Sequence, residues 1–297
     1  MSTTEDQCDN FTNDSAMMIA WERHLEGIRD DALFHDPFAK SLAGSKGEKL
    51  SADFGANCAM FEFPDWPEFH RTWTAVRTKF IDDRIKEFAD SGKITQLINL
   101  GAGLDTRPYR LESYKIFSGG NFDFDMEVVN NNKRVVFEKF LHAPQAHCPT
   151  SDININFLND GKTISTELDA AAHVAGCKCT FDKSKPSVII CEGLIMYLGK
   201  VGKEKIIKDL SAVAAPGSVL VLQYLDGSES ETAKNIPGAL DNALSRAEAT
   251  QFLRAGGWDT DTLKFYRFGE EKLNYGRFPL DKFSPTAGFS FLVCHKA

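Results

Sequence analysis

A glycine-rich turn, Gly101-Ala102-Gly103, directly follows a short apolar segment at residues 96–100. Glycine has no Cβ, so such a turn permits tight backbone geometry and lets a ligand approach the main chain closely. In an α/β sheet the turn would lie at the carboxyl end of a central strand, where ligands bind. A dinucleotide site prefers a third small residue where this sequence has Thr106. The turn therefore favours a cofactor without a pyrophosphate over a nicotinamide dinucleotide.

Two acidic residues end or follow neighbouring apolar segments. Asp125 ends the segment at residues 122–125, and Glu192 directly follows residues 187–191. The carboxylate of Asp125 could accept hydrogen bonds from both ribose hydroxyls of an adenosine, or it could cap the next helix. Glu192 could contact the polar end of the same cofactor, or cap the helix that follows it. The turn and the acids together predict an adenosine-containing cofactor.

The segments that position these residues alternate between apolar runs and helix-like stretches. The apolar runs lie at residues 96–100, 122–125, 153–158, 187–191, 218–224 and 289–295. Strands that alternate with helices of this length predict a doubly wound, mostly parallel sheet of the α/β class. A final antiparallel pair of strands would suit this fold, although no sharp two-residue turn marks one.

The first part of the chain has helical patterns. A helix is predicted to begin after Asp14, which would be its N-cap. A second, short helical pattern follows Asp36-Pro37 and ends at Gly44. The apolar spacing at residues 73–92 is typical of an amphipathic helix that leads into the first strand.

Aromatic residues are dense between residues 54 and 73. They fit two interpretations equally well, a cap over the active site or ordinary core packing. The domain organisation that we expect is a polar, mobile N-terminus at 1–14 and a single domain at 15–297, with a helical extension and cap at 15–92 and a cofactor-binding core with C-terminal substrate elements at 93–297.

Composition limits the classes of partner. The net charge of -8 and the isoelectric point near 5.4 argue against a nucleic-acid partner, which needs a basic surface. No apolar run approaches the length of about 20 residues that spans a bilayer, and the polar start lacks the pattern of a signal peptide.

The seven cysteines are odd in number and scattered, which predicts free thiols in a reducing compartment. Cys177 and Cys179 form a lone C-x-C, so we expect no metal site, and we expect a cytoplasmic protein without a membrane partner.

Four segments, in order, resemble the leucine carboxyl methyltransferase family, which includes tRNA wybutosine methyltransferases and many bacterial O-methyltransferases. They are RTKFIDD, NLGAGLDTRPYRL, FDFD and CEGLIMYL. The resemblance runs from about Ser15 to the C-terminus. It implies an S-adenosyl-L-methionine-dependent methyltransferase with a mostly parallel, seven-stranded Rossmann-like sheet and an N-terminal helical cap.

The resemblance also implies roles for single residues. Arg77 would bind the methionine carboxylate of the cofactor, since a guanidinium can hold a carboxylate through two parallel hydrogen bonds. Gly101 and Gly103 would contact the cofactor, Asp125 would bind its ribose, and Glu192 would lie near its amino-acid end. Arg110 also matches the family pattern, in a role that could be structural.

One position departs from the family pattern. The family usually has an Asp-Leu pair after the third strand, where the carboxylate reaches the adenine amino group, and this chain has Phe157 before Leu158. That hydrogen bond would be lost or supplied by Asn156 or Asp160, or the adenine would stack against Phe157. The first acid of the family's E-x-D segment is also changed here, to Asp123.

Methyl transfer from a sulfonium is an in-line displacement, so the protein must chiefly orient the donor and the acceptor. The resemblance favours an oxygen nucleophile, and a carboxylate on a small molecule or at a protein C-terminus needs no general base, since it is ionised at neutral pH. No catalytic residue stands out, because the histidines are dispersed at positions 24, 35, 70, 142, 147, 173 and 295. Two alternatives stay open: a nicotinamide-dependent oxidoreductase on a similar sheet, and a non-catalytic cofactor-binding regulatory protein.

Overall fold

A single mixed sheet organises the chain. The computed structural model describes residues 4–57, 66–158, 161–174, 179–226, 243–268, 270, 273, 275–277 and 288–297. Within these ranges the strands are β1 (Gln96–Leu100), β2 (Gly120–Asp125), β3 (Thr150–Asn154), β4 (Ser187–Cys191), β5 (Val219–Leu225), β6 (Trp258–Arg267) and β7 (Phe289–Lys296).

The strand order is β3-β2-β1-β4-β5-β7-β6, with β1 to β5 parallel and β7 antiparallel to both of its neighbours. β1, β2 and β4 are buried along their whole length, as expected for central strands covered on both faces. The predicted doubly wound, mostly parallel seven-stranded sheet is confirmed.

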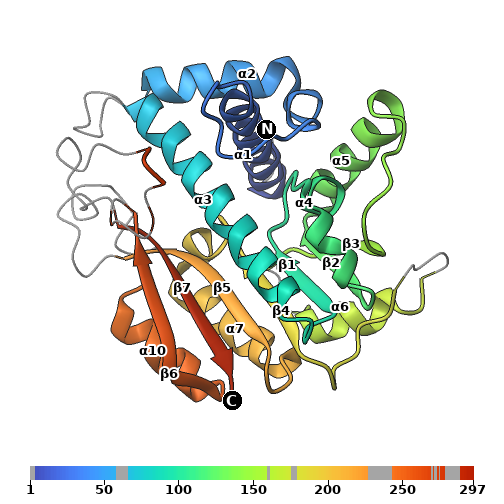
Figure 1. Cartoon of the computed structure of the whole chain (residues 1–297), viewed down its shortest axis with the longest axis vertical. Coiled ribbons are helices and arrows are strands. Elements are labelled where there is room, and N and C mark those ends of the chain that lie inside the picture. The colour runs from blue at the N-terminus through green and yellow to red at the C-terminus, as the bar shows by residue number, and fades with distance from the viewer. Residues whose placement is uncertain are drawn as a thin grey trace.

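Helices cover both faces of the sheet (Figure 1). They are α1 (Thr4–Gly27), α2 (Ala39–Asn57), α3 (Trp66–Asp90), α4 (Arg107–Arg110), α5 (Glu127–Phe140), α6 (Ile164–Ala171), α7 (Gly199–Val213) and α10 (Arg246–Ala255), with short 3-10 turns η2 (Glu112–Ile116) and η3 (Ile195–Tyr197). In the described part of the chain, no helix is both long and apolar enough to cross a membrane.

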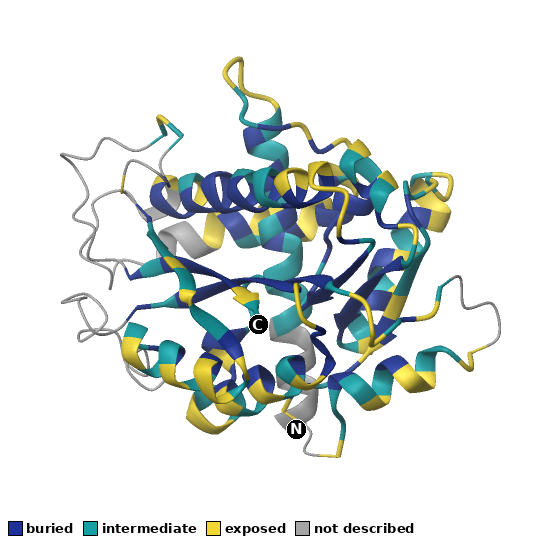
Figure 2. Cartoon of the chain, turned by 60° about the horizontal axis from the view of Figure 1, so that its bottom comes forward, coloured by how far each residue is buried: buried dark blue, intermediate teal, exposed yellow. Residues whose placement is uncertain are grey.

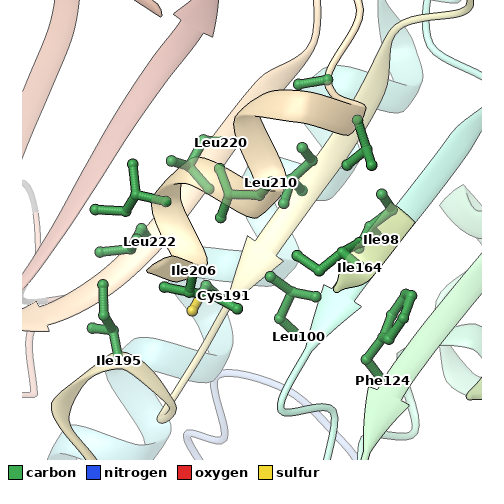
Figure 3. Close-up of a cluster of buried hydrophobic side chains, with 14 of the residues drawn as sticks. Ile98, Leu100, Phe124, Ile164, Cys191, Ile195, Ile206, Leu210, Leu220 and Leu222 are labelled. Atoms are coloured by element: carbon green, nitrogen blue, oxygen red, sulfur yellow. The ribbon is translucent and has the colours of Figure 1, made fainter. Parts of the chain in front are cut away.

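Two apolar clusters fill the space between the sheet and the helices. One contains Ile98, Leu100 and Leu220 of the sheet with side chains of α6, α7 and α10 (Figure 3). The other lies on the opposite face and joins α3 to Leu97 and Phe291. The central strands β1, β2 and β4 are accordingly buried between helices whose outer faces are exposed (Figure 2).

The aromatic stretch contributes to the second cluster. Phe69 and Trp73 are each only 1% exposed, and both rings contact Phe268 and Phe289. For these two residues the structure supports core packing rather than a cap. The side chains of Phe54, Phe61, Phe63 and Trp66 lie outside the described residues.

Two predicted boundaries in the N-terminal part were wrong. α1 begins at Thr4, so Asp14 lies within the helix, where its carboxylate is 2.5 Å from Lys46 Nζ of α2. Gly44 (φ 57°, ψ -171°) is a kink inside α2 rather than its end, and the helix continues to Asn57. Polar residues extend these helices, which a search for apolar spacing alone does not detect.

Two strand predictions also needed correction. β3 covers Thr150–Asn154 rather than residues 153–158, because its polar first residues pair with β2 at the sheet edge. The apolar run does not mark the strand, because Ile155 and Phe157 belong to the loop that follows it and are buried there. β6 was not predicted; it pairs with β7, and residues 268–288 separate the two strands, which explains why the sequence contains no tight turn signal.

Asp36 connects the N-terminal helices to the rest of the domain. Its side chain is fully buried and accepts hydrogen bonds from Arg23 Nε (2.9 Å), Thr106 Oγ1 (2.7 Å) and the backbone amides of Phe38 and Ala39 (3.1 Å each). The last two bonds cap the start of α2. A carboxylate three residues before the first residue of α2 thus holds α1, α2 and the segment after the glycine turn together.

Charge pairing accounts for the ionised state of this group. Burial works to raise the pKa of Asp36, yet the pKa lies below its ordinary value because Arg23 and Arg110 stabilise the carboxylate. Arg110 Nε is 4.0 Å from Asp36 Oδ2. Two buried cations therefore interact with this acid, and Arg23 is the one that lies closer to it.

Replacing Asp36 with alanine should lower the free energy of unfolding by about 3 to 5 kcal/mol, because it leaves the buried guanidinium of Arg23 without its carboxylate partner. Urea unfolding followed by circular dichroism measures the change. The control is Glu112→Ala, which removes an exposed ion pair with Lys115 and should change stability by less than about 0.5 kcal/mol. If Asp36→Ala lowers the free energy of unfolding as little as the control does, Asp36 does not have the stabilising role assigned to it.

Candidate active site

The strand register brings the predicted site residues to one edge of the sheet. Leu100, the last residue of β1, is paired with Phe124 of β2 on one side and with Cys191 of β4 on the other. Gly101, Asp125 and Glu192 come directly after these three aligned residues. Because neighbouring strands are about 4.8 Å apart, the three positions lie side by side, as the sequence predicted.

The glycine turn is fixed by contacts on several sides. Gly101 (φ 67°) and Gly103 (φ 55°) both have left-handed backbone conformations, which favour glycine. The amides of Gly101 and Ala102 donate to the carbonyl of Phe124 at 2.9 and 3.0 Å. A Cβ on Gly101 would lie 3.0 Å from Leu194 Cβ, so glycine is required there for packing against the segment after β4.

Asp125 links the glycine turn to the residue before α5. Its carboxylate accepts hydrogen bonds from the amides of Gly103 (2.6 Å) and Met126 (2.7 Å), and the residue is 4% exposed. Burial raises the pKa of Asp125 to about 6, although the two amide hydrogen bonds act in the opposite direction. A carboxylate has about four lone-pair directions, so ligand hydroxyls can still be accepted.

Arg77 and Glu192 form a pair beside the turn. Arg77 Nε is 3.0 Å from Glu192 Oε1, and the two side chains are 10% and 15% exposed. The pair lacks hydrogen-bond geometry, so within the described ranges the buried Nε of Arg77 has no hydrogen-bond partner. Gly193 (φ 65°) donates its amide to Gln223 Oε1 at 2.8 Å, and a Cβ on Gly193 would lie 3.9 Å from Arg77 Nη1. The guanidinium of Arg77 thus lies beside the backbone of Gly193, where there is no side chain.

Sequence reasoning missed Arg107, which lies at the centre of the charged groups. Its side chain is 3% exposed and forms ion pairs with Asp82 (2.7 Å), Asp105 (2.9 Å) and Glu192 (2.9 Å). Arg110, three residues later on α4, contacts both oxygens of Asp82 at 2.7 and 2.9 Å. The signal in the sequence was the pair of arginines three residues apart, which places both on one side of a helical turn.

The ion pairs balance one another. Burial alone would raise the pKa of Asp105, but Arg107 and its backbone amide lower that pKa to about 2. Ion pairs and side-chain hydrogen bonds link these groups into a network. Its members with side chains at most 15% exposed are five cations and five carboxylates, which are Arg23, Arg77, Arg107, Arg110, Lys133, Asp36, Asp82, Asp105, Asp123 and Glu192. The more exposed Asp152 lies 3.9 Å from Lys133 at its edge.

Phe157 and Leu158, in the loop after β3, differ in exposure. Phe157 is 9% exposed and packs in the same apolar cluster as Ile164 and Leu168 of α6. Leu158 is 55% exposed, and its amide donates to Asn156 Oδ1 at 3.0 Å. Adenine stacking on Phe157 stays a prediction, and Asp160 lies outside the described residues.

α1 lies over the glycine turn, where a cap was predicted. A Cβ on Gly103 would lie 3.6 Å from Ala16 Cβ of α1. Ser15 is hydrogen-bonded to Tyr197, and Arg23 Nη2 donates to the carbonyl of Leu104 at 2.7 Å. The N-terminal helix therefore contacts the segments after both β1 and β4.

A buried polar contact fixes α1 on α3. Glu22 accepts hydrogen bonds from Thr74 Oγ1 (2.6 Å) and pairs with His70 Nδ1 (2.9 Å). His70, Thr74 and Arg77 follow one another at spacings of four and three residues, so they lie on the same face of α3. His70 thus pairs with a buried acid of α1.

Comparison with known proteins identifies similar sequences and folds. A family model described as leucine carboxyl methyltransferase matches residues 16–211. A protein of Mycobacteroides abscessus, provisionally named an S-adenosyl-L-methionine-dependent methyltransferase, is 27% identical over 89% of this chain and 87% of its own length. A Mycolicibacterium vanbaalenii protein with the same name is 29% identical over 78% of this chain and 77% of its own length.

Solved structures share the fold. A crystal structure from Thermobifida fusca, provisionally titled a methyltransferase, has a TM-score of 0.56 at 16% identity and covers 94% of each chain. A structure from Streptomyces avermitilis has a TM-score of 0.57 at 14% identity, covering 95% of this chain and 97% of its own. At these identities the similarity concerns the fold alone.

The raised pKa of Asp125 predicts a pH dependence of stability. Because its pKa is about 6 in the folded chain and 3.8 ordinarily, the folded state binds the proton more tightly. This contribution to stability is complete below the ordinary pKa and is lost as the pH rises through about 6. Between about pH 4 and pH 7, the free energy of unfolding should fall by about 2 kcal/mol relative to Asp125→Asn.

Urea unfolding of both proteins across that pH range, without ligand, measures the difference. The asparagine keeps an acceptor oxygen but does not titrate, so it serves as the reference. Parallel pH profiles of the free energy of unfolding for the two proteins would show that burial does not raise the pKa of Asp125.

Proposed function

This chain belongs to the leucine carboxyl methyltransferase family, and on that premise we propose that it transfers a methyl group from S-adenosyl-L-methionine to an oxygen nucleophile. The observation that carries the proposal is the placement of Arg77, Glu192 and Asp125 around one glycine turn. When bound, the cofactor supplies a methyl group on a sulfonium, which is displaced in line.

The charges of the site match the chemistry of this cofactor. Its amino-acid end is a zwitterion, so a guanidinium can take the carboxylate while a carboxylate takes the ammonium. Arg77 and Glu192 supply this pair in adjacent positions, and the buried Nε of Arg77 lacks a hydrogen bond within the described part of the chain. Asp125 would accept hydrogen bonds from the ribose hydroxyls, and the backbone at Gly101 and Gly103 would lie against the adenosyl group.

A carboxylate is the acceptor that we infer. It is ionised at neutral pH and reacts without a general base, so the protein needs to orient it and exclude water. Glu192 is held by two arginines and Asp125 by two backbone amides. These acids are occupied in binding, which suits an acceptor that needs no proton removed.

The main rival is a nicotinamide-dependent oxidoreductase. In such a site the position of Thr106 would be glycine or alanine, so that the helix packs against the pyrophosphate. Here Thr106 is fully buried and donates its hydroxyl to Asp36. The side chain has a structural partner, which disfavours a dinucleotide. A regulatory protein that binds the cofactor without catalysis is the second rival.

Isothermal titration calorimetry with S-adenosylhomocysteine tests the cofactor assignment. We expect the wild-type chain to bind it and not NAD. Arg77→Ala should weaken binding by about 1.5 to 3 kcal/mol, the value of a hydrogen bond to a charged group.

Arg71→Ala is the matched control, because Arg71 is an exposed arginine on the same helix. It should leave the affinity unchanged. Binding of NAD but not of S-adenosylhomocysteine would overturn the proposed function. Equal affinities of wild type and Arg77→Ala would assign the arginine another role.

The acceptor class is tested with methyl-labelled S-adenosylmethionine and a panel of carboxylic acids, including peptides with a free C-terminus, each matched by its amide, together with phenols. We expect label on carboxylates only, released as methanol by mild base, because methyl esters hydrolyse and methyl ethers do not. Base-stable label on a phenol, a nitrogen or a carbon would refute the carboxylate assignment. A chain that binds the cofactor but labels no acceptor would favour the regulatory alternative.

A further inference from the structure

Arg107 links the cofactor-facing acid to the interior of the protein. Its Nη1 lies 2.9 Å from both Asp105 Oδ2 and Glu192 Oε2, and its Nε donates to Asp82 Oδ1 at 2.7 Å. The backbone amide of Arg107 also donates to Asp105 Oδ1 at 2.9 Å. The three hydrogen bonds of its side chain leave this buried guanidinium little freedom to move.

The two oxygens of Glu192 consequently face different arginines. Oε1 lies toward Arg77 Nε and Oε2 accepts from Arg107 Nη1. One carboxylate therefore bridges a deeply buried cation and the cation at the edge of the site, whose side chains are 3% and 10% exposed.

We propose that Arg107 is a positioning residue for methyl-donor binding: it fixes the carboxylate of Glu192 so that Arg77 stays available to the methionine carboxylate and Glu192 to the ammonium. This inference rests on the proposed function. A carboxylate and a guanidinium that are otherwise unrestrained adopt a bidentate pair. Without Arg107, Glu192 would turn both oxygens to Arg77 and compete with the carboxylate of the cofactor.

The role concerns the amino-acid end of the cofactor alone, which makes it separable from a general effect on folding. Arg110 provides the comparison, because it lies on the same short helix, is equally buried and binds the same Asp82. Its ion pairs go to Asp82 and Asp36, and among the described residues none of them goes to Glu192. A purely structural contribution of α4 would affect both arginines alike.

The experiment compares two ligands, S-adenosylhomocysteine and 5′-methylthioadenosine, which keeps the adenosyl group but lacks the amino-acid end. Arg107→Lys retains the charge but not the fork of donors, and should weaken S-adenosylhomocysteine binding about tenfold while leaving 5′-methylthioadenosine unchanged. Arg110→Lys should leave the ratio of the two affinities at the wild-type value. Thermal unfolding confirms that each variant is folded, and Arg107→Gln is the second variant if the lysine is not tolerated.

A double-mutant cycle with Glu192→Gln supplies an independent measurement. If Arg107 acts through Glu192, the double variant binds S-adenosylhomocysteine no less tightly than the single variant with the lower affinity. Additive losses, an equal loss for both ligands, or no loss in Arg107→Lys would each overturn the inference. Failure of the wild-type chain to bind S-adenosylhomocysteine is a different result, since it refutes the proposed function itself.

Discussion

Pairing of buried charges is the constraint on which this site depends. An isolated charge in a protein interior costs far more free energy than a domain can offset, so each buried ion must have a partner. Beneath the glycine turn five cations and five carboxylates meet this requirement jointly, from α1 through α4 to β2. The network connects segments far apart in the sequence. Its contacts also fix the positions of Arg77 and Glu192 at its edge.

Much of the site could be predicted from the sequence because parallel strands leave little choice of geometry. β1 and β4 have the bounds that their apolar runs predicted, and their register places Gly101 and Glu192 side by side. The family pattern added Arg77, which no periodicity would have selected. Arg107 was missed because its importance comes from Asp82 and Asp105, and tertiary packing alone brings α3 to the segment after β1.

The elements whose boundaries were wrong share a physical cause. α1 and β3 contain polar residues that are stabilised by partners elsewhere in the fold, as the ion pair of Asp14 with Lys46 and the pairing of β3 with β2 illustrate. Hydrophobic periodicity detects burial and is blind to such partners. β6 is mostly half-buried at an edge of the sheet, so it has no apolar run. Residues 268–288 separate it from β7, so local turn chemistry could not reveal the pairing.

The bond between Thr106 and Asp36 has an evolutionary consequence. The position that would have to become small for a dinucleotide turn is the one whose hydroxyl completes the environment of a buried acid seventy residues earlier. A lineage that exchanged Thr106 for glycine would leave Asp36 with one donor fewer, and a change at Asp36 would strand Arg23. The two positions should therefore change together, and descent with a change of cofactor would require concerted replacement in the N-terminal extension and in the segment after the glycine turn.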